Sequence, residues 1–280
     1  MRRWLLYPTL SAPMPFQMAF DEILFRRTEE LPLTPTLSPK GRGQGEGVPI
    51  LRFYFSSDPW VTVGYSDRER EAKGAGQEAR DNNLPVCRRL TGGGQVLHGK
   101  DLIFSVIARK EADESFRSVR ISYLKIHEAV KTALENLGAS PRFYRCDENL
   151  PKGKDCFRFP IATDLAMENR KIAGGAQKRS CGALLHQESV QTEQFGAEPL
   201  IGGLRAGFEK IFAMRLELAE LDPRWLQEAE KLAERKYGQE IGQSPGTGSH
   251  HRPFESSNPL KNFLTDRGRQ VKVSENRYRY

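Results

Sequence analysis

Apolar residues recur at intervals of three and four along several stretches of the chain, which is the spacing of a helix with one buried face. The pattern predicts helices at 16–27 and 119–137, with further helices at 197–213 and 223–236, the last of which begins at a proline. His127 falls near the edge of the apolar face of its helix. We interpret it as a boundary residue of that face and not as a catalyst.

Other stretches are short and rich in β-branched and aromatic residues, which predicts strands. The first ten residues form one such stretch, and the others are 50–55, 60–65, 86–90, 95–98 and 102–109. The segments 50–55 and 60–65 are predicted to pair around the turn SSDP, and 142–190 is predicted to hold short strands with two glycine-containing turns. Because strands come in clusters and do not alternate steadily with helices, the pattern predicts an α+β fold with a mixed β-sheet flanked by helices.

Composition and charge narrow the class of protein. The chain has 280 residues, of which 38% are hydrophobic and 28% charged, and its net charge is +7. No apolar run reaches the length of a membrane span, so a cytoplasmic protein is expected. The basic residues are scattered, which argues against nucleic-acid binding and suits an acidic protein partner. Neither a nucleic-acid nor a membrane partner is predicted.

Four cysteines are the candidate thiols: Cys87, Cys146, Cys156 and Cys181. They lie too far apart in the sequence for a metal-binding pair, and no metal site is predicted. Each is interpreted first as a small buried hydrophobic residue. Cys156 differs because Lys152, Lys154 and Arg158 are its sequence neighbours, and cations that are also close in space lower a thiol pKa.

The segment RRLTGGGQVLHG, residues 88–99, is the strongest local motif. Three glycines between two predicted strands let the backbone turn sharply and approach a ligand closely. Arg88 and Arg89 precede them and are suited to an anionic group. A flexible turn without a ligand is the alternative interpretation.

A second motif follows at 169–189, where Lys171 precedes Gly174 and Gly175. A lysine beside glycines can place a fixed positive charge in a pocket and stabilise an oxyanion or a phosphate. The alternative is an ordinary surface lysine.

Together these segments resemble the biotin/lipoate protein ligase superfamily, and within it the lipoate ligases and octanoyltransferases. Four stretches are similar in order, and the resemblance covers about residues 1–215. They are QMAFDEILF (17–25), LRFYFSSDPWVTVGY (51–65), RRLTGGGQVLHG (88–99), and KIAGGAQKR (171–179) with LLHQES behind it. The resemblance implies one catalytic domain over 1–215. Residues 31–47 are rich in Pro, Gly, Ser and Thr and have no periodicity, so they are predicted to be a disordered insertion in it. The sequence pattern predicts a helical C-terminal extension over 216–280 with a flexible loop at 242–258.

The resemblance also implies one of two mechanisms. In octanoyltransferases a cysteine takes the acyl group from acyl carrier protein and passes it to a lysine of a lipoyl domain, with no cofactor. Cys156, about fifteen residues before Lys171, resembles that nucleophile, and Lys171 would stabilise the oxyanion. Cys181 is the competing thiol. The implied substrate-binding residues are Arg89, Gly92, Gly93, Gly94, Val96, His98, Ile172, Gly174 and Ala176, with the acyl tail beside Val96 and Ile172.

The expected acceptor is a lipoyl carrier domain, such as that of the glycine-cleavage H protein or of a dehydrogenase E2. The first rival is an ATP-dependent lipoate ligase, which would need ATP and Mg and would use Lys171 to hold the phosphate. The second is a non-catalytic acyl- or carrier-binding protein. Gly94, Glu188 and the pair Gly174-Gly175 depart from the pattern of the cysteine-type transferases, and the form with Gly94 is closer to the ligases.

Overall fold

The computed structural model describes residues 2–30, 47–65, 84–144, 163–168, 170–191 and 193–238. All of them belong to one compact unit, Met1–Gln243. The loop predicted at 242–258 and almost all of the insertion predicted at 31–47 lie outside the described residues, as do Cys146 and Cys156. Within the described part of the chain, no helix has both the length and the apolar character needed to cross a membrane.

A large mixed sheet forms the centre of the unit, and its described strands follow the order β11-β1-β2-β6-β10-β9-β8-β7. Strands β11, β1 and β2 run parallel to one another, and the pairs from β2 to β7 are antiparallel. This confirms the predicted fold class. The strands are β1 (Arg2–Ala12), β2 (Ile50–Ser56), β6 (Asp101–Arg109), β7 (Arg142–Phe143), β8 (Leu165–Met167), β9 (Arg170–Ser180), β10 (Ala183–Gln191) and β11 (Met214–Leu218).

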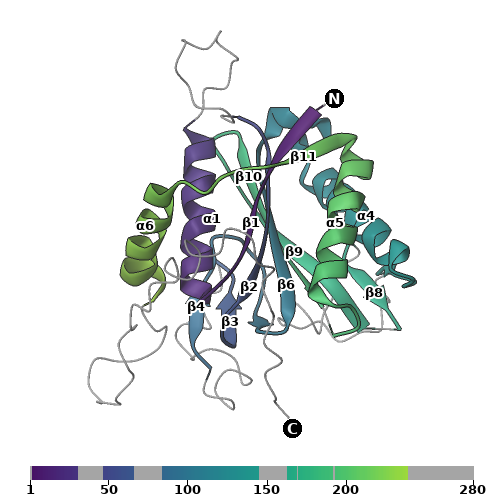
Figure 1. Cartoon of the computed structure of the whole chain (residues 1–280), viewed down its shortest axis with the longest axis horizontal. Helices are drawn as coiled ribbons and strands as arrows, with labels where there is room; N and C mark the ends of the chain where they lie inside the picture. Colours follow the sequence, from purple (N-terminus) through teal and green to yellow (C-terminus); the bar gives the residue numbers. More distant parts are fainter. Residues whose placement is uncertain are drawn as a thin grey trace. The chain divides into compact units, whose positions relative to one another are not determined.

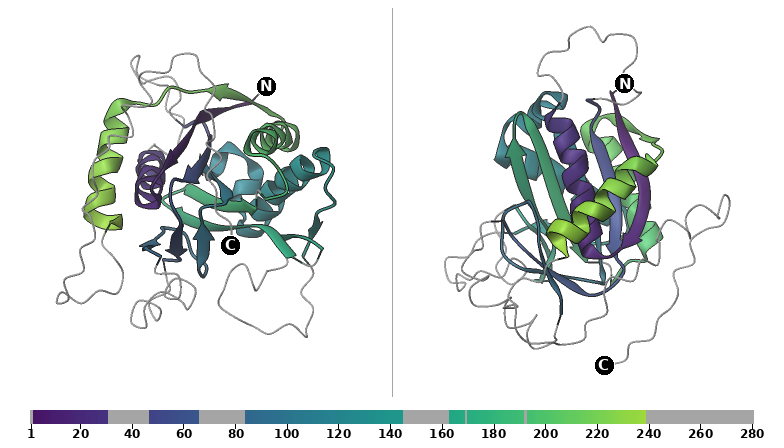
Figure 2. Two further views of the ribbon diagram at one scale, coloured as in Figure 1. Left: turned by 60° about the horizontal axis from the view of Figure 1, so that its bottom comes forward. Right: turned by 90° about the vertical axis from the view of Figure 1, so that its left-hand side faces the viewer.

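A second, small sheet has the order β4-β3-β5 and lies at the end of the large sheet that is lowest in Figure 1 (Figures 1 and 2). Its strands are β3 (Trp60–Val63), β4 (Val86–Arg88) and β5 (Val96–His98). The predicted pairing of 50–55 with 60–65 is therefore wrong. Strand β2 lies between β1 and β6, where nearly all its residues are buried, and the turn after it leads into the other sheet.

The segment 142–190 also differs from its prediction. Its main feature is the long hairpin of β9 and β10, which pair in register from Ala173 to Ser180. Gly174 and Gly175 lie inside β9 and not in a turn. The hairpin turn is made by Cys181 and Gly182, both of which have positive φ angles.

The helices are α1 (Met14–Glu29), α4 (Val119–Asn136), α5 (Ala197–Phe212) and α6 (Pro223–Leu232), the last of which continues into a π-helical turn, Ala233–Tyr237. These bounds confirm the predicted helices to within a few residues. The side chain of Asp222 accepts a hydrogen bond from the Arg224 amide at 2.9 Å, and Pro223 follows at the first helical position. This N-cap and proline explain why α6 begins where it does.

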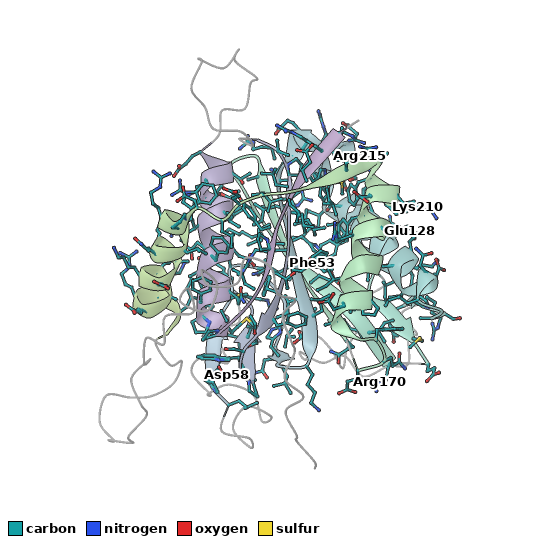
Figure 3. All side chains as sticks on the ribbon, viewed as in Figure 1. Phe53, Asp58, Glu128, Arg170, Lys210 and Arg215 are labelled. Atoms are coloured by element: carbon teal, nitrogen blue, oxygen red, sulfur yellow. The ribbon has the colours of Figure 1, made fainter. Side chains whose placement is uncertain are left out.

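The helices cover both faces of the large sheet (Figure 1). Helices α4 and α5 lie on one face, and α1 with α6 lies on the other. The main hydrophobic core fills the space between the sheet and α4 and α5, where Phe104 meets Phe208 edge-on with ring centroids 5.4 Å apart. Phe53 belongs to the same core and lies near the middle of the sheet in Figure 3.

Candidate active site

The glycine-rich loop between β4 and β5 is fixed by contacts with the end of β3. Gly93 has a φ of +88°, a conformation that favours glycine. A Cβ on Gly64 would lie 1.9 Å from the Gly93 carbonyl oxygen, so the two backbones can approach this closely only without a side chain. The Arg89 guanidinium donates to the Gly92 carbonyl at 2.7 Å and to the Thr62 hydroxyl at 3.2 Å. Arg89 thus helps to hold the loop in its shape.

His98, a predicted substrate-binding residue, is buried in a chain of polar side chains behind the loop. Its Nε2 lies 2.8 Å from the Thr62 hydroxyl, and its Nδ1 lies 2.8 Å from Oδ2 of Asp101. Ser189 donates to the same carboxylate oxygen at 2.5 Å. Burial alone would raise the pKa of Asp101, but His98 and the hydrogen bonds to the carboxylate hold it below its ordinary value. The imidazole therefore joins the small sheet to β6 and β10.

A second buried network ties the same loop to α1. The Thr91 hydroxyl donates to Gln187 at 2.8 Å, and the Gln187 amide donates to Asp21 at 2.8 Å. The Asp21 carboxylate also accepts from Arg52 at 2.5 Å in an ion pair whose two side chains are at most 1% exposed. A charged residue in the middle of each apolar segment, α1 and β2, was the sequence signal for this network.

Lys171 lies near the start of β9, next to Arg170, which Figure 3 shows at the lower end of the sheet. Its ammonium nitrogen is 2.8 Å from Oδ2 of Asp164, and both side chains are at most 5% exposed. A Cβ on Gly174 would lie 2.2 Å from that nitrogen. The missing side chain at position 174 therefore makes the space that the ammonium group occupies. The predicted pair of Lys171 and Gly174 is brought together, and Asp164 is a partner that sequence reasoning missed.

Adjacent strand residues point to opposite faces, and Gly175 accordingly faces the α4 side of the sheet. A Cβ there would lie 2.2 Å from Oε2 of Glu188 and 2.6 Å from Nε2 of His186. The same carboxylate oxygen is 2.7 Å from His186 and 2.9 Å from Nε2 of His127. The interpretation of His127 as a boundary residue is wrong, because its side chain, like those of His186 and Glu188, is fully buried.

Hydrogen bonds assign the protons of this cluster. Arg179 donates to the side-chain oxygen of Gln177, Oε1, at 3.0 Å, which turns the side-chain nitrogen of Gln177 toward Nδ1 of His186 at 3.1 Å. His186 then accepts at Nδ1, so it is neutral and its proton is on Nε2, pointing at Glu188. Burial lowers the pKa of His186, in agreement with a neutral ring. His127 instead faces acceptors at both nitrogens, the Thr163 carbonyl and Glu188.

The charges of the cluster follow from these partners. Burial would lower the pKa of His127, but Glu188 and the Thr163 carbonyl raise it above its usual value. Burial would raise the pKa of Glu188, but His127 and His186 together lower it to about 2. The three side chains have ligand types and proximity that suit a metal ion. The proton on Nε2 of His186 occupies the position that a metal would need, so the network fits an imidazolium–carboxylate pair better.

The remaining predicted residues take different positions. Ala176 pairs with Gln187 on β10, and Val96 is half-buried on β5. Ile172 belongs to the main hydrophobic core. The placement of the acyl tail beside Val96 and Ile172 stays a prediction.

Two of the cysteines are described, and neither suits thioester chemistry near Lys171. Cys87 is buried, and burial raises the pKa of its thiol to about 12. Cys181 is exposed but lies in the turn at the other end of β9, about 30 Å along the strand from Lys171. The predicted competition from Cys181 is weakened by this separation.

Comparison with known proteins identifies the family of this chain and solved structures that share its fold. The family model of the lipoyl protein ligase A/B catalytic domain matches residues 13–193. An octanoyltransferase LipM of Bacillus cereus is 28% identical over 267 residues, which cover 79% of this chain and 91% of that protein. The solved structure of protein Ta0514 from T. acidophilum with bound lipoic acid is similar at a TM-score of 0.64 and 22% identity, covering 85% of this chain and 98% of that one. Lipoate-protein ligase A bound with ATP is similar at a TM-score of 0.62 and 22% identity, covering 85% of this chain and 96% of that one.

Proposed function

Because the chain belongs to the lipoyl protein ligase A/B catalytic domain family, we propose that it is an octanoyltransferase that acylates a lysine of a lipoyl carrier domain. The observation that carries this proposal is the ammonium group of Lys171, which Asp164 holds in the space left open by Gly174. A fixed buried cation stabilises negative charge that develops on a carbonyl oxygen. The choice of a transferase over a ligase rests on the likeness to octanoyltransferase LipM, which extends over 91% of that protein.

In the proposed reaction the Cys156 thiolate attacks the carbonyl carbon of an octanoyl thioester carried by acyl carrier protein. Lys171 and the backbone amides of 92–94 stabilise the oxyanion. The carbon–sulfur bond to the donor then breaks, and the donor leaves as a thiolate that takes up a proton. Next, the uncharged lysine amine of the lipoyl domain attacks the Cys156 thioester, and the bond to Cys156 breaks as the amide forms. The nitrogen loses a proton, and the Cys156 sulfur returns as a thiolate or thiol.

The proposed substrate residues divide into those that shape the site and those that border it. Arg89 and His98 would shape the loop of Gly92, Gly93 and Gly94 from behind, in keeping with their hydrogen bonds. Val96, Ile172, Gly174 and Ala176 would border the acyl chain. We propose residues 1–215 as the catalytic unit and 216–280 as an extension of it.

The test measures octanoyl transfer to a lipoyl domain in the absence of any nucleotide. The full chain is incubated with octanoyl acyl carrier protein and a lipoyl domain in the presence of EDTA. We expect octanoylated lysine on the acceptor, and in the absence of acceptor a hydroxylamine-sensitive octanoyl mass on the peptide that contains Cys156. Formation of product only from free octanoate or lipoate with ATP and Mg would instead establish the ligase mechanism. Binding of acyl carrier protein without product by either route would establish a non-catalytic protein.

Gly174→Ala tests the placement of Lys171. The added methyl group would lie 2.0 Å from Cε and 2.2 Å from Nζ of Lys171, so the ammonium group must leave its position beside Asp164. We expect kcat to fall by about 10- to 100-fold because oxyanion stabilisation is lost, with little loss of folding because a flexible side chain can yield. Gly202→Ala on α5 is the matched control, since nothing lies within 4 Å of its Cβ position. Equal activity of the two variants would contradict the role of Lys171.

A further inference from the structure

The buried cluster on the α4 side of the sheet is joined to the proposed active site through one hydrogen bond. Nδ1 of His127 donates to the carbonyl oxygen of Thr163. Thr163 immediately precedes Asp164, whose carboxylate holds the Lys171 ammonium at 2.8 Å. His127 comes from the middle of α4, so a helix on one face of the sheet fixes the backbone next to a charged pair that acts on the other face.

The two histidines of the cluster differ in the group that their second ring nitrogen contacts. Both donate to Oε2 of Glu188, at 2.9 Å from His127 and 2.7 Å from His186. The second nitrogen of His186 faces Gln177, whereas that of His127 faces Thr163. Only the His127 ring therefore connects the Glu188 carboxylate with the backbone beside Asp164, within the residues that the structure describes.

The surroundings explain why this hydrogen bond persists. His127 is buried, and its Nε2–H is held by Glu188, so the ring has a fixed orientation. An imidazolium makes a charge-assisted hydrogen bond, which is shorter and stronger than one between neutral groups. Asp164 is itself buried, with a carbonyl that accepts from the Tyr144 amide at 2.8 Å. The segment before β8 thus has two anchors, one from Tyr144, which directly follows β7, and one from α4.

We propose that His127 is a positioning residue for the proposed acyl transfer: it holds the Thr163 carbonyl and so keeps Asp164 where it orients Lys171. The inference rests on the proposed function for its catalytic consequence and on the observed contacts for its structural part. His127 does not touch the substrate or the reacting atoms. Glu188 supports it by fixing the ring, and His186 donates to the same oxygen of that carboxylate.

Paired substitutions separate the two contacts of His127. The amide nitrogen of asparagine lies near the position of histidine Nδ1, and that of glutamine lies near Nε2. His127→Asn therefore retains the hydrogen bond to the Thr163 carbonyl and loses the one to Glu188. His127→Gln retains the hydrogen bond to Glu188 and loses the one to Thr163. His186→Gln is the matched control, since it replaces the other buried imidazole on Glu188 and leaves Thr163 untouched.

The first measurement requires no turnover. Each folded variant is treated briefly with an amine-acetylating reagent, and the acetylation rate of Lys171 is followed by peptide mass spectrometry. We expect His127→Gln to react about tenfold faster than the parent protein, as does Asp164→Asn, because the amine loses its fixed partner; a tenfold change corresponds to about 1.4 kcal/mol. His127→Asn and His186→Gln should react at nearly the parent rate. Equal rates in His127→Gln and His186→Gln would overturn the proposal.

The second measurement concerns the reaction. We expect His127→Gln to lower kcat for octanoyl transfer about tenfold with little change in KM for the lipoyl domain, and His127→Asn to restore most of kcat. If His127→Gln does not fold, His127→Asn decides, because Lys171 acetylation as fast as in Asp164→Asn would overturn the proposal and the parent rate would support it. Absence of transfer by the parent protein would refute the proposed function and leave the acetylation result valid.

Discussion

Cys156→Ser is expected to abolish octanoyl transfer, with kcat at least about 1000-fold below that of the parent protein. A serine hydroxyl is not ionised at neutral pH, and an ester on serine would pass its acyl group to an amine far more slowly than a thioester. The measurement is the initial rate of octanoyl-lysine formation on a lipoyl domain. The variant should form no acyl-enzyme when it is incubated with octanoyl acyl carrier protein.

Cys181→Ser and Cys87→Ser are the matched controls for this substitution. Cys181 lies in the hairpin turn far along β9 from Lys171, and the Cys87 thiol is kept protonated by burial. Both variants should retain the parent rate of transfer. Full activity of Cys156→Ser, together with loss of activity in either control, would assign the nucleophile to another thiol.

Glu188→Gln is expected to produce the largest loss of stability among single substitutions near the site. Removing one partner of a buried ion pair costs about 3–5 kcal/mol, because the remaining charge is buried without compensation. Here that charge is the imidazolium of His127, whose hydrogen-bonded carboxylate partner is Glu188. The free energy of unfolding, measured by urea denaturation at pH 7, should fall by this amount. Glu135→Gln should change it by less than about 0.5 kcal/mol, since the ion pair of Glu135 with Lys131 is partly exposed.

The pH dependence of unfolding gives an independent check on the same cluster. The pKa of Glu188 is lowered to about 2 from 4.5, so its contribution is present above pH 4.5 and is lost as the pH falls toward 2. The pKa of His127 is raised from 6.5, so its contribution is complete below pH 6.5 and is lost as the pH rises through the raised value. The free energy of unfolding of the parent protein should decrease toward acidic pH (the acidic limb) and toward alkaline pH. In Glu188→Gln the acidic limb should be smaller, and what remains of it comes from other carboxyls with a lowered pKa, such as Asp101. An unchanged acidic limb in Glu188→Gln would contradict the assigned charges.

Much of the fold could be predicted from the sequence because the long apolar periodicities report buried faces directly. Helices at 119–137 and 197–213 agree with α4 and α5 to within about one residue at each end. The pairing of 50–55 with 60–65 failed because a short turn suggests a hairpin, whereas the partners of β2 are β1 and β6, which lie far away in the sequence. Strand β11 was missed because only one of its residues, Met214, is buried.

The candidate site was predicted in part. The loop at 92–94 and the pair of Lys171 with Gly174 are local motifs, and the structure brings each together. The buried cluster was not predicted, because His127 and Glu188 are 61 positions apart and a run of polar residues on a strand suggests exposure. Four consecutive polar residues of β10, 186–189, are all buried, since hydrogen bonds on both faces of the sheet satisfy them.

The adjacent glycines of β9 make the sheet unusually thin at one point. Between the Lys171–Asp164 pair and the Glu188 carboxylate, Gly174 and Gly175 contribute main chain alone, since neither residue has a side chain. Opposite charges on the two faces can therefore act on one another through a single layer of peptide groups, in a setting that excludes water and weakens screening. A mutation in the interior behind this layer would alter the electrostatic potential at the ammonium group without touching anything that an acyl chain could reach.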